Sequence, residues 1–300
     1  MNHLISMRDL TKAEIQQFIS TAAKIEKGEL QPDLTGRVMG ALFFEPSTRT
    51  HLSFETAMKR LGGEVISMSG TKGTSVEKGE TLADTVKVIN QYSDIIVIRH
   101  ALEGAARYVS EQVTVPVVNA GDGANQHPTQ SLLDLYSIYK TQNRLTGLTI
   151  ALIGDLKYGR TVHSLVHALA HTQPKFYFIS PPSLQMPRYI KDELREMKVD
   201  FEEGEHVEDV INQLDILYVT RIQRERFADP VDYERVKNAY VISRALLQNV
   251  KPNLKVLHPL PRVNEISTDV DQTKYAYYFQ QAKNGVFMRQ AILSILLGEI

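Results

Sequence analysis

The sequence predicts an α/β protein that consists of two doubly wound domains with mainly parallel sheets. Strand and helix patterns alternate along the chain, which is typical of parallel strands covered by helices on both faces. A polar segment at residues 141–147 divides this alternation into two halves. With 300 residues, of which 43% are apolar, the chain is long enough for two hydrophobic cores. We therefore expect the first domain to end near residue 142.

The first half is expected to begin with a helix and to continue with alternating strands and helices. Thr11 and Glu14 have the spacing of a capping box, so the helix begins there, and Gly28 ends it. A buried strand at 38–44 stops before Pro46, because proline has no N–H group for a strand ladder. The next helix carries the apolar residues Leu52, Ala57, Met58 and Leu61 and ends at Gly62 and Gly63. The remaining elements are strands at 64–68, 94–98 and 115–118 and helices at 81–91, 103–112 and 128–140.

The second half repeats this pattern. Its strands are expected at residues 148–153, 175–179, 216–220 and 255–257, and its helices at 161–171, 189–197 and 285–297. The last of these helices is apolar around most of its circumference. We therefore expect it to be buried on more than one side.

Polar and basic residues follow six of the predicted strands at their carboxyl ends. Open α/β sheets bind ligands at that edge, so we interpret these six segments as parts of one site rather than as unrelated loops. The segments are residues 45–50, 99–100, 119–130, 154–161, 221–223 and 258–262.

The first of these segments has the composition of an anion site. Ser47, Thr48 and Thr50 supply three hydroxyl groups, and Arg49 supplies a positive charge, at the expected start of a helix. The first turn of a helix presents free backbone N–H groups and a partial positive charge, which favour a bound anion. The same hydroxyl groups would also fit an ordinary helix cap.

The composition excludes several classes of protein. Lysine and arginine number 34 against 35 aspartate and glutamate, and a net charge of -1 gives no indication of a nucleic-acid or membrane surface. Residues 1–10 lack the pattern of a signal peptide, and the apolar runs are too short to span a bilayer. The chain has no cysteine, which excludes disulfides, thiolate metal ligands and cysteine nucleophiles and fits the cytosol. We expect no metal and no cofactor.

Two nucleotide-binding alternatives fit less well. Residues 154–161 differ from a P-loop by having Arg160 where the lysine should be, and Asp215 precedes its strand instead of following it to hold magnesium. A dinucleotide fingerprint is absent from the sequence, and Ser180 follows its strand where that fold needs an acid. A non-catalytic binding protein of two α/β lobes stays open, because a fold does not fix a function.

Five motifs together resemble the aspartate/ornithine carbamoyltransferase family. They lie in the family's order over nearly the whole chain, at residues 47–50, 127–130, 154–160, 220–223 and 258–261. The ornithine branch typically has a cysteine where this chain has Pro259. Arg160 and Arg221 suit the second carboxylate of aspartate, so the resemblance favours the aspartate branch.

The resemblance implies a function for each half of the chain. Residues 1–142 would bind carbamoyl phosphate, with the C-terminal helix at 285–300 packing back on them, and residues 143–284 would bind aspartate. Helices would join the two domains. The reaction would give N-carbamoyl-L-aspartate and phosphate, the committed step of de novo pyrimidine biosynthesis, without a cofactor. The family further implies a cytoplasmic homotrimer with shared active sites, and it leaves a separate regulatory chain open.

The resemblance also assigns residues. The residues expected to bind carbamoyl phosphate are Ser47, Thr48, Arg49, Thr50, Arg99, His127, Gln130, Leu260 and Pro261. Those expected to bind aspartate are Lys78, Arg160, Arg221 and Gln223. The catalytic set is Arg49, Thr50, Lys78, Arg99 and His127. Lys78 would reach the site of a neighbouring subunit together with Ser75, for which Thr74 is the alternative hydroxyl.

Overall fold

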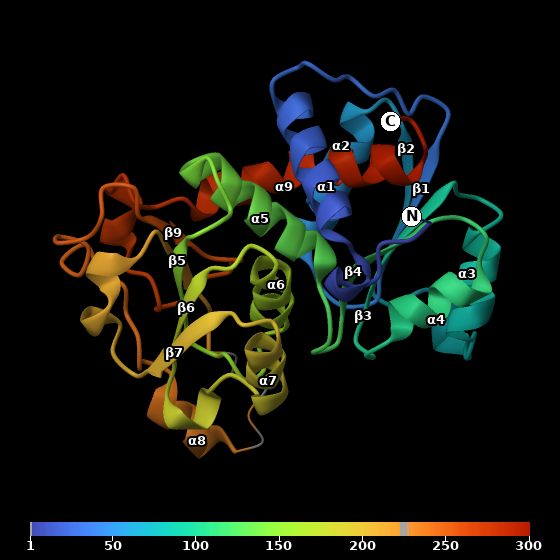
Figure 1. Ribbon diagram of the computed structural model, residues 1–300. Coiled ribbons are helices and arrows are strands. Elements are labelled where there is room, and N and C mark those ends of the chain that lie inside the picture. The colour runs from blue at the N-terminus through green and yellow to red at the C-terminus, as the bar shows by residue number, and fades with distance from the viewer. Residues whose placement is uncertain (1, 223–226, 228) are drawn as a thin grey trace. The chain divides into compact units, whose positions relative to one another are not determined.

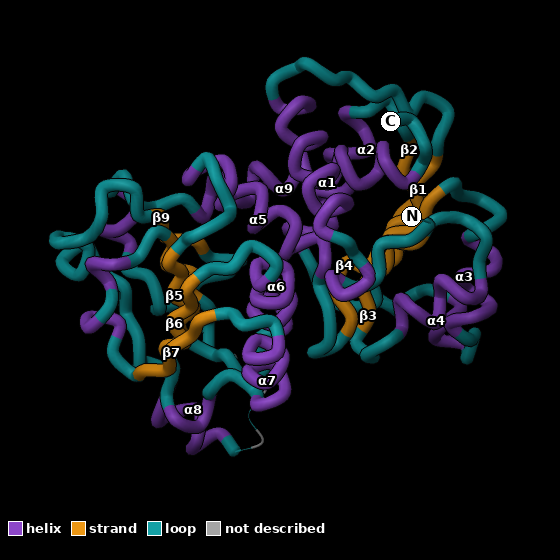
Figure 2. The backbone as a smooth tube through the Cα atoms, in the orientation of Figure 1, coloured by secondary structure: helices purple, strands orange, loops and turns teal. Residues whose placement is uncertain are grey.

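The computed structural model describes residues 2–222, 227 and 229–300 and divides the chain into two compact units (Figures 1 and 2). The first unit consists of Met1–Tyr136 and Lys283–Ile300, and the second of Ser137–Ala282. Two helices, α5 (Pro128–Gln142) and α9 (Tyr278–Leu296), contribute residues to both units. Each unit contains one sheet, drawn in orange in Figure 2.

The sheet of the first unit has the order β2-β1-β3-β4, and every pairing in it is parallel. Its strands are β1 (Val38–Phe43), β2 (Glu64–Ser69), β3 (Ile95–His100) and β4 (Val117–Asp122). Leu4 continues the sheet beyond β4 by a parallel bridge to Val118. The parallel α/β architecture predicted from the sequence is confirmed for this unit.

Four helices of the first unit follow the predicted ones closely: α1 (Lys12–Glu26), α2 (Thr48–Arg60), α3 (Leu82–Ile89) and α4 (Ala105–Gln112). The capping box is confirmed, because Thr11 N–H donates to Glu14 Oε2 at 2.8 Å and Glu14 N–H donates to Thr11 Oγ1 at 3.2 Å. Leu52 lies on α2 as predicted, and its side chain is 55% exposed. The buried stripe of α2 contains Phe54 and Met58, one helical turn apart, and Leu52 lies off that stripe.

The sheet of the second unit has the order β7-β6-β5-β8-β9 and is also parallel throughout. Its strands are β5 (Thr149–Ile153), β6 (Lys175–Ile179), β7 (Asp200–Gly204), β8 (Ile216–Val219) and β9 (Lys255–Leu257). Its helices are α6 (Arg160–Ala170), α7 (Arg188–Glu196) and the short α8 (Pro230–Val236). Strand β7 and helix α8 are not predicted from the sequence. Charged residues at the exposed edge of the sheet give β7 no apolar run to recognise.

The last helix begins seven residues earlier than the sequence indicates, at Tyr278 instead of Gly285. Its first two turns contain polar residues that resemble a loop in the sequence, although Gln281 and Asn284 are each only 1% exposed. Gly285 therefore lies inside the helix.

Asp215 is a buried polar residue at the amino end of β8, 3% exposed. It accepts hydrogen bonds from Thr149 N–H at 3.0 Å, from Lys251 Nζ at 3.0 Å and from Asn253 Nδ2 at 2.9 Å. Burial raises the pKa of Asp215, but these hydrogen bonds outweigh burial, so its pKa lies below the usual value. The carboxylate therefore ties strand β5 to the segment before β9.

We expect Asp215→Asn to lower the free energy of unfolding by about 1–3 kcal/mol at pH 7, because it removes a charged acceptor from three donors. A depressed pKa in the folded state contributes stability above the ordinary carboxyl pKa. That stability is lost as the pH falls through the folded pKa. Urea unfolding between pH 3 and pH 7 should therefore show a smaller acid destabilisation in the variant. An equal slope in both proteins would contradict this role.

Candidate active site

In each sheet, strands that follow one another in the sequence are added first toward one edge and then toward the other, so the order reverses at one point. In the first unit it lies between β1 and β3, and in the second between β5 and β8. Ligands of open α/β sheets bind outside the carboxyl ends of the strands at such switch points. The predicted site segments lie at the carboxyl ends of β1, β3 and β4 in the first unit and of β5, β8 and β9 in the second.

In the first unit, strand pairing brings the Ser47–Thr50 turn beside Arg99. Phe43 lies opposite Arg99 in the register of β1 and β3, and Phe44 N–H donates to the Arg99 carbonyl at 2.9 Å. Ser47 occupies the N-cap position of α2, but its hydroxyl makes no capping hydrogen bond within the described part of the chain. The ordinary-cap interpretation is therefore wrong for the Ser47 hydroxyl.

The charge at this edge comes from two arginines. Arg49 is exposed in the first turn of α2, and partial desolvation lowers its pKa without removing its charge at neutral pH. Arg99 Nε lies 3.5 Å from Glu45 Oε2, and its Nη1 donates to the Ala120 carbonyl at 3.4 Å. These contacts orient Arg99 between the β1 turn and β4. Glu45 is a positioning residue that the sequence analysis did not identify.

Asp122, 1% exposed at the end of β4, fixes the loop that leads to His127. Its carboxylate accepts from Gly104 N–H at 2.8 Å, from Asn125 Nδ2 at 3.0 Å and from Gln126 N–H at 3.0 Å. The loop is thus rigid immediately before α5. The sequence placed Asp122 in a polar segment but gave no signal of this role.

His127 and Gln130 are both buried at the start of α5, 4% and 8% exposed. His127 Nδ1 lies 3.4 Å from Thr129 Oγ1, and Gln130 N–H donates to the His127 carbonyl at 3.0 Å. The two predicted residues therefore share the first turn of one helix, at the carboxyl end of the strand next to β3.

The long polar loop after β2 is ordered by its own hydrogen bonds. Glu77 Oε2 accepts from Gly73 N–H at 2.7 Å, and the Thr74 hydroxyl donates to the Thr71 carbonyl at 2.6 Å. A 3-10 turn, Ser75–Lys78, ends this loop with both terminal side chains exposed. Because the Thr74 hydroxyl is engaged inside the loop, Ser75 is the better candidate for a ligand contact.

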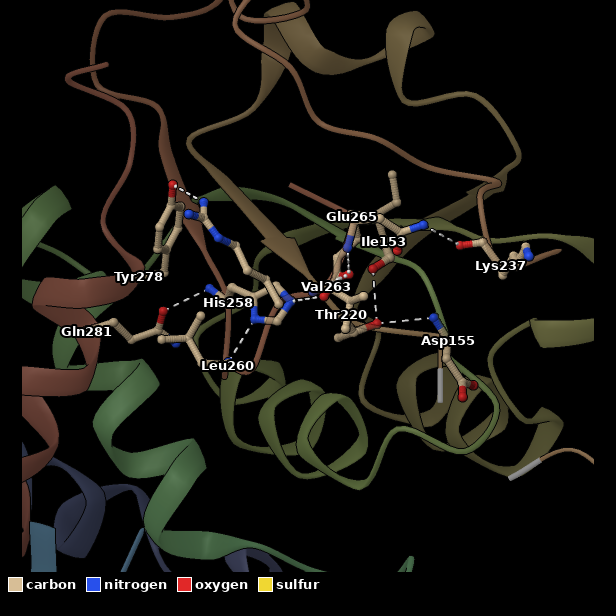
Figure 3. A network of polar contacts seen from close by, with 12 residues as sticks. Ile153, Asp155, Thr220, Lys237, His258, Leu260, Val263, Glu265, Tyr278 and Gln281 are labelled. Atoms are coloured by element: carbon tan, nitrogen blue, oxygen red, sulfur yellow. Dashed lines mark hydrogen bonds and ion pairs between the residues drawn. The ribbon is translucent and has the colours of Figure 1, made fainter. Parts of the chain in front are cut away.

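In the second unit, the β5 and β8 loops touch directly. Gly154, with φ +117°, packs against Thr220 so closely that a Cβ atom would lie 2.3 Å from the Thr220 carbonyl oxygen. Asp155 N–H donates to Thr220 Oγ1 at 3.1 Å (Figure 3). This contact holds together the loop that leads to Arg160, the first residue of α6, and the loop that begins with Arg221. The predicted Gln223 lies outside the described residues.

The turn after β9 is held by a buried histidine. Leu260 N–H donates to His258 Nδ1 at 2.7 Å, and His258 Nε2 contacts Glu265 Oε1 at 2.7 Å (Figure 3). Since Nδ1 accepts, the proton must be on Nε2, which donates to Glu265. Burial raises the pKa of Glu265, but hydrogen bonds from His258 and the backbone outweigh it and leave the pKa below its usual value.

The backbone of this turn is strained. Leu260 has φ +54°, a conformation that costs a residue with a side chain about 1–3 kcal/mol. The hydrogen bond to His258 Nδ1 holds Leu260 in that conformation, and the His258 N–H group itself donates to Gln281 Oε1 at 2.9 Å. The sequence predicted that this turn presents the carbonyls of Leu260 and Pro261 but missed Glu265 and Gln281 as their support.

The two units therefore present different functional groups. The first offers helix N–H groups, hydroxyls, two arginines, a histidine and an amide, and the second offers two arginines and a constrained pair of backbone carbonyls. Among the residues that the structure describes, no three metal-ligating side chains gather in one place. Over the same residues, no helix is both long and apolar enough to cross a bilayer.

Comparison with known proteins finds two family models that match successive parts of the chain. Residues 2–140 match the family described as aspartate/ornithine carbamoyltransferase, carbamoyl-P binding domain. Residues 146–296 match aspartate/ornithine carbamoyltransferase, Asp/Orn binding domain. The aspartate carbamoyltransferase catalytic subunit of Bacteroides thetaiotaomicron is 55% identical over 296 residues, which are 98% of this chain and 95% of that protein.

Two solved structures resemble the chain over nearly its full length. The catalytic subunit of M. jannaschii aspartate transcarbamoylase has a TM-score of 0.93 at 51% identity and covers 99% of this chain and 98% of its own. Aspartate transcarbamoylase from Trypanosoma cruzi, in complex with carbamoyl phosphate and aspartate, has a TM-score of 0.91 at 40% identity, covering 97% and 96%. The resemblance seen in the five motifs is thereby confirmed, and the chain belongs to the aspartate/ornithine carbamoyltransferase family.

Proposed function

We propose that this chain transfers the carbamoyl group of carbamoyl phosphate to the amino group of L-aspartate. The products are N-carbamoyl-L-aspartate and phosphate, and the reaction is the committed step of de novo pyrimidine biosynthesis. The observation that carries the proposal is the Ser47–Thr50 turn at the start of α2, paired with Arg99 at the switch point of its sheet. A 40% identical relative from Trypanosoma cruzi binds both substrates in its structure, which supports the same choice of substrates here.

Carbamoyl phosphate is the ligand of the first unit in this proposal. The N–H groups and hydroxyls of Ser47, Thr48 and Thr50 bind the phosphate oxygens, because a helix N-terminus favours an anion. Arg49 and Arg99 pair with the same oxygens. Thr50, Arg99 and His127 donate to the carbamoyl oxygen as negative charge develops on it. Gln130 and the carbonyls of Leu260 and Pro261 accept from the carbamoyl N–H groups.

Aspartate is the ligand of the second unit. Arg160 and Arg221 each present a planar pair of donors, which fits a carboxylate with two parallel hydrogen bonds. Gln223 adds a neutral polar contact. The aspartate nitrogen bonds to the carbamoyl carbon, the bond from that carbon to the phosphate oxygen breaks, and the amine gives up a proton. Correct placement of the two substrates supplies about 7–11 kcal/mol of the reduction in barrier.

We further propose that the site is completed by a neighbouring copy of the chain in a cytoplasmic homotrimer. The ordered loop that ends at Lys78 exposes Ser75 and Lys78, which would enter the neighbour's site, where Lys78 would bind aspartate. A separate regulatory chain stays open as a further partner. The mass of the native assembly in cell extract tests for both, because a trimer and a trimer with added chains differ in mass.

Phosphate release from carbamoyl phosphate tests the proposed reaction. Release should depend on L-aspartate, and L-ornithine should not replace it, because ornithine lacks the second carboxylate that Arg160 and Arg221 bind. Asparagine should also be a poor substrate. Release that proceeds equally without an amino acid, or faster with ornithine, would contradict the proposal.

We expect Arg221→Ala to raise the KM for aspartate by about 10–100-fold, because a charge-assisted carboxylate pair contributes about 1.5–3 kcal/mol. The KM for carbamoyl phosphate should change by less than about threefold, since Arg221 is not among the residues proposed to bind that substrate. Steady-state kinetics with each substrate varied in turn measure both constants. An unchanged aspartate KM would show that the second unit does not bind aspartate through Arg221.

A further inference from the structure

Gln130 is fixed by a buried carboxylate one helical turn away. Its Nε2 donates to Asp134 Oδ1 at 2.9 Å, and both residues lie on α5 within the first unit. Asp134 is fully buried and Gln130 is 8% exposed. Within the described chain, Gln130 Oε1 makes no hydrogen bond.

The chemistry of a carboxylate decides which end of the Gln130 amide faces Asp134. An ionised carboxylate only accepts hydrogen bonds, whereas an amide has an NH₂ group that donates and an oxygen that accepts. The NH₂ group must therefore face Asp134, and the oxygen must face away from it. If the amide turned over, two acceptors would meet in a buried place, which is costly.

A buried arginine lies close enough to Asp134 for the two to attract each other. Arg289, 3% exposed on α9, is attracted by Asp134 and lies with its Cζ 5.0 Å from the centre of the Phe54 ring. Burial lowers the pKa of Arg289 to about 10, opposed by the attraction of Asp134, so the guanidinium is still protonated at pH 7. Gly285 leaves room for this group, since a Cβ atom there would lie 2.4 Å from Arg289 Nη1.

We propose that Asp134 is a specificity-determining residue. It orients the Gln130 amide so that its oxygen, and not its NH₂ group, meets the transferred group. An oxygen at this position accepts from the NH₂ group of carbamoyl phosphate. It has nothing to accept from the methyl group of acetyl phosphate, a molecule of similar shape. Asp134 therefore selects carbamoyl over other acyl phosphates, an inference that rests on the proposed function.

The test compares the dissociation constants of acetyl phosphate and carbamoyl phosphate, measured by calorimetry on the full-length protein. In Asp134→Asn the new amide can donate to Gln130 Oε1, so the Gln130 amide is free to turn over. The preference for carbamoyl phosphate should fall about 10-fold, the effect of roughly one hydrogen bond. The affinity for inorganic phosphate should change less than about twofold, because the phosphate site is not altered.

Asp94→Asn is the matched control. Asp94 accepts from Val38 N–H at 2.8 Å and pairs with Arg37 at 3.2 Å, at the amino end of the sheet of the first unit. Losing it should lower stability and leave the carbamoyl preference unchanged. An unchanged preference in Asp134→Asn, or an equal fall in Asp94→Asn, would overturn the proposal.

Two further measurements separate orientation from folding. In a Gln130→Met background, Asp134→Asn should have no additional effect on the preference, whereas a purely structural role of Asp134 would still lower it. If Asp134→Asn does not fold, Gly285→Ala takes its place, because the added Cβ atom displaces Arg289 from Asp134. The preference for carbamoyl phosphate over acetyl phosphate should then fall about threefold. No fall in this variant would overturn the proposal.

The failure of this inference and of the proposed function would look different. A wild-type protein that prefers carbamoyl phosphate but shows no aspartate-dependent turnover contradicts the function and leaves the selection by Asp134 intact. Normal turnover with an unchanged preference in Asp134→Asn contradicts only the inference.

Discussion

Lys78→Ala and Arg49→Ala, each nearly inactive alone, are expected to regain activity when they are mixed, dissociated and reassembled. In the proposed trimer, each site uses Arg49 of one chain and Lys78 of its neighbour. Every mixed ring of three then contains one site in which both residues are wild type. Random reassembly should therefore restore about a quarter of the wild-type activity, because about three quarters of the rings are mixed.

The structure motivates this experiment through the loop that ends at Lys78. Its internal hydrogen bonds hold the loop in one conformation, while Ser75 and Lys78 are exposed at its end. The control is reassembly of each variant with itself, which should stay inactive. If mixed trimers are confirmed by native mass and remain inactive, Lys78 does not serve a neighbouring site.

His127→Ala should lower kcat by about 10²–10³-fold, the typical loss when one donor to a developing oxyanion is removed. His127 is 4% exposed and is positioned by the first turn of α5, which Asp122 anchors from the preceding loop. The KM values for both substrates should change far less, since the hydrogen bond strengthens only as the carbonyl oxygen becomes negative. Steady-state kinetics separate the two effects.

The result that would contradict this role is a large increase in KM with an unchanged kcat. Thr129→Val is a useful control, because the Thr129 hydroxyl lies 3.4 Å from His127 Nδ1 and its loss leaves the imidazole in place. This variant should retain most of the activity.

The sequence predicted most of the architecture because alternating strands and helices have strong local signals. Elements with weak signals were missed. Strand β7 carries charges at a sheet edge, α8 is only seven residues long, and the first turns of α9 contain the polar residues Gln281 and Asn284, which are buried in the fold. Burial of those turns depends on tertiary packing, which local propensity does not encode.

The residues of the candidate site likewise fall into those that the sequence predicts and those that only the fold reveals. Arg49, His127 and Arg221 could be predicted because they lie in the segments that follow strands, where ligands of open α/β sheets bind. The residues that position these site residues could not be predicted from the sequence. Glu265 and Arg289 are ordinary charged residues in the sequence, and only the fold places one against His258 and the other near Asp134. Asp134 did have a local signal, since it lies one helical turn after Gln130.

The most direct test of the central claim is whether a bond forms between the carbamoyl carbon and the aspartate nitrogen. Incubation of the protein with [¹³C]carbamoyl phosphate and [¹⁵N]L-aspartate, followed by ¹³C NMR, should give a carbonyl signal split by its bonded ¹⁵N, with one phosphate released per product. An unsplit ¹³C signal with release of phosphate would show hydrolysis instead of transfer and would contradict the account.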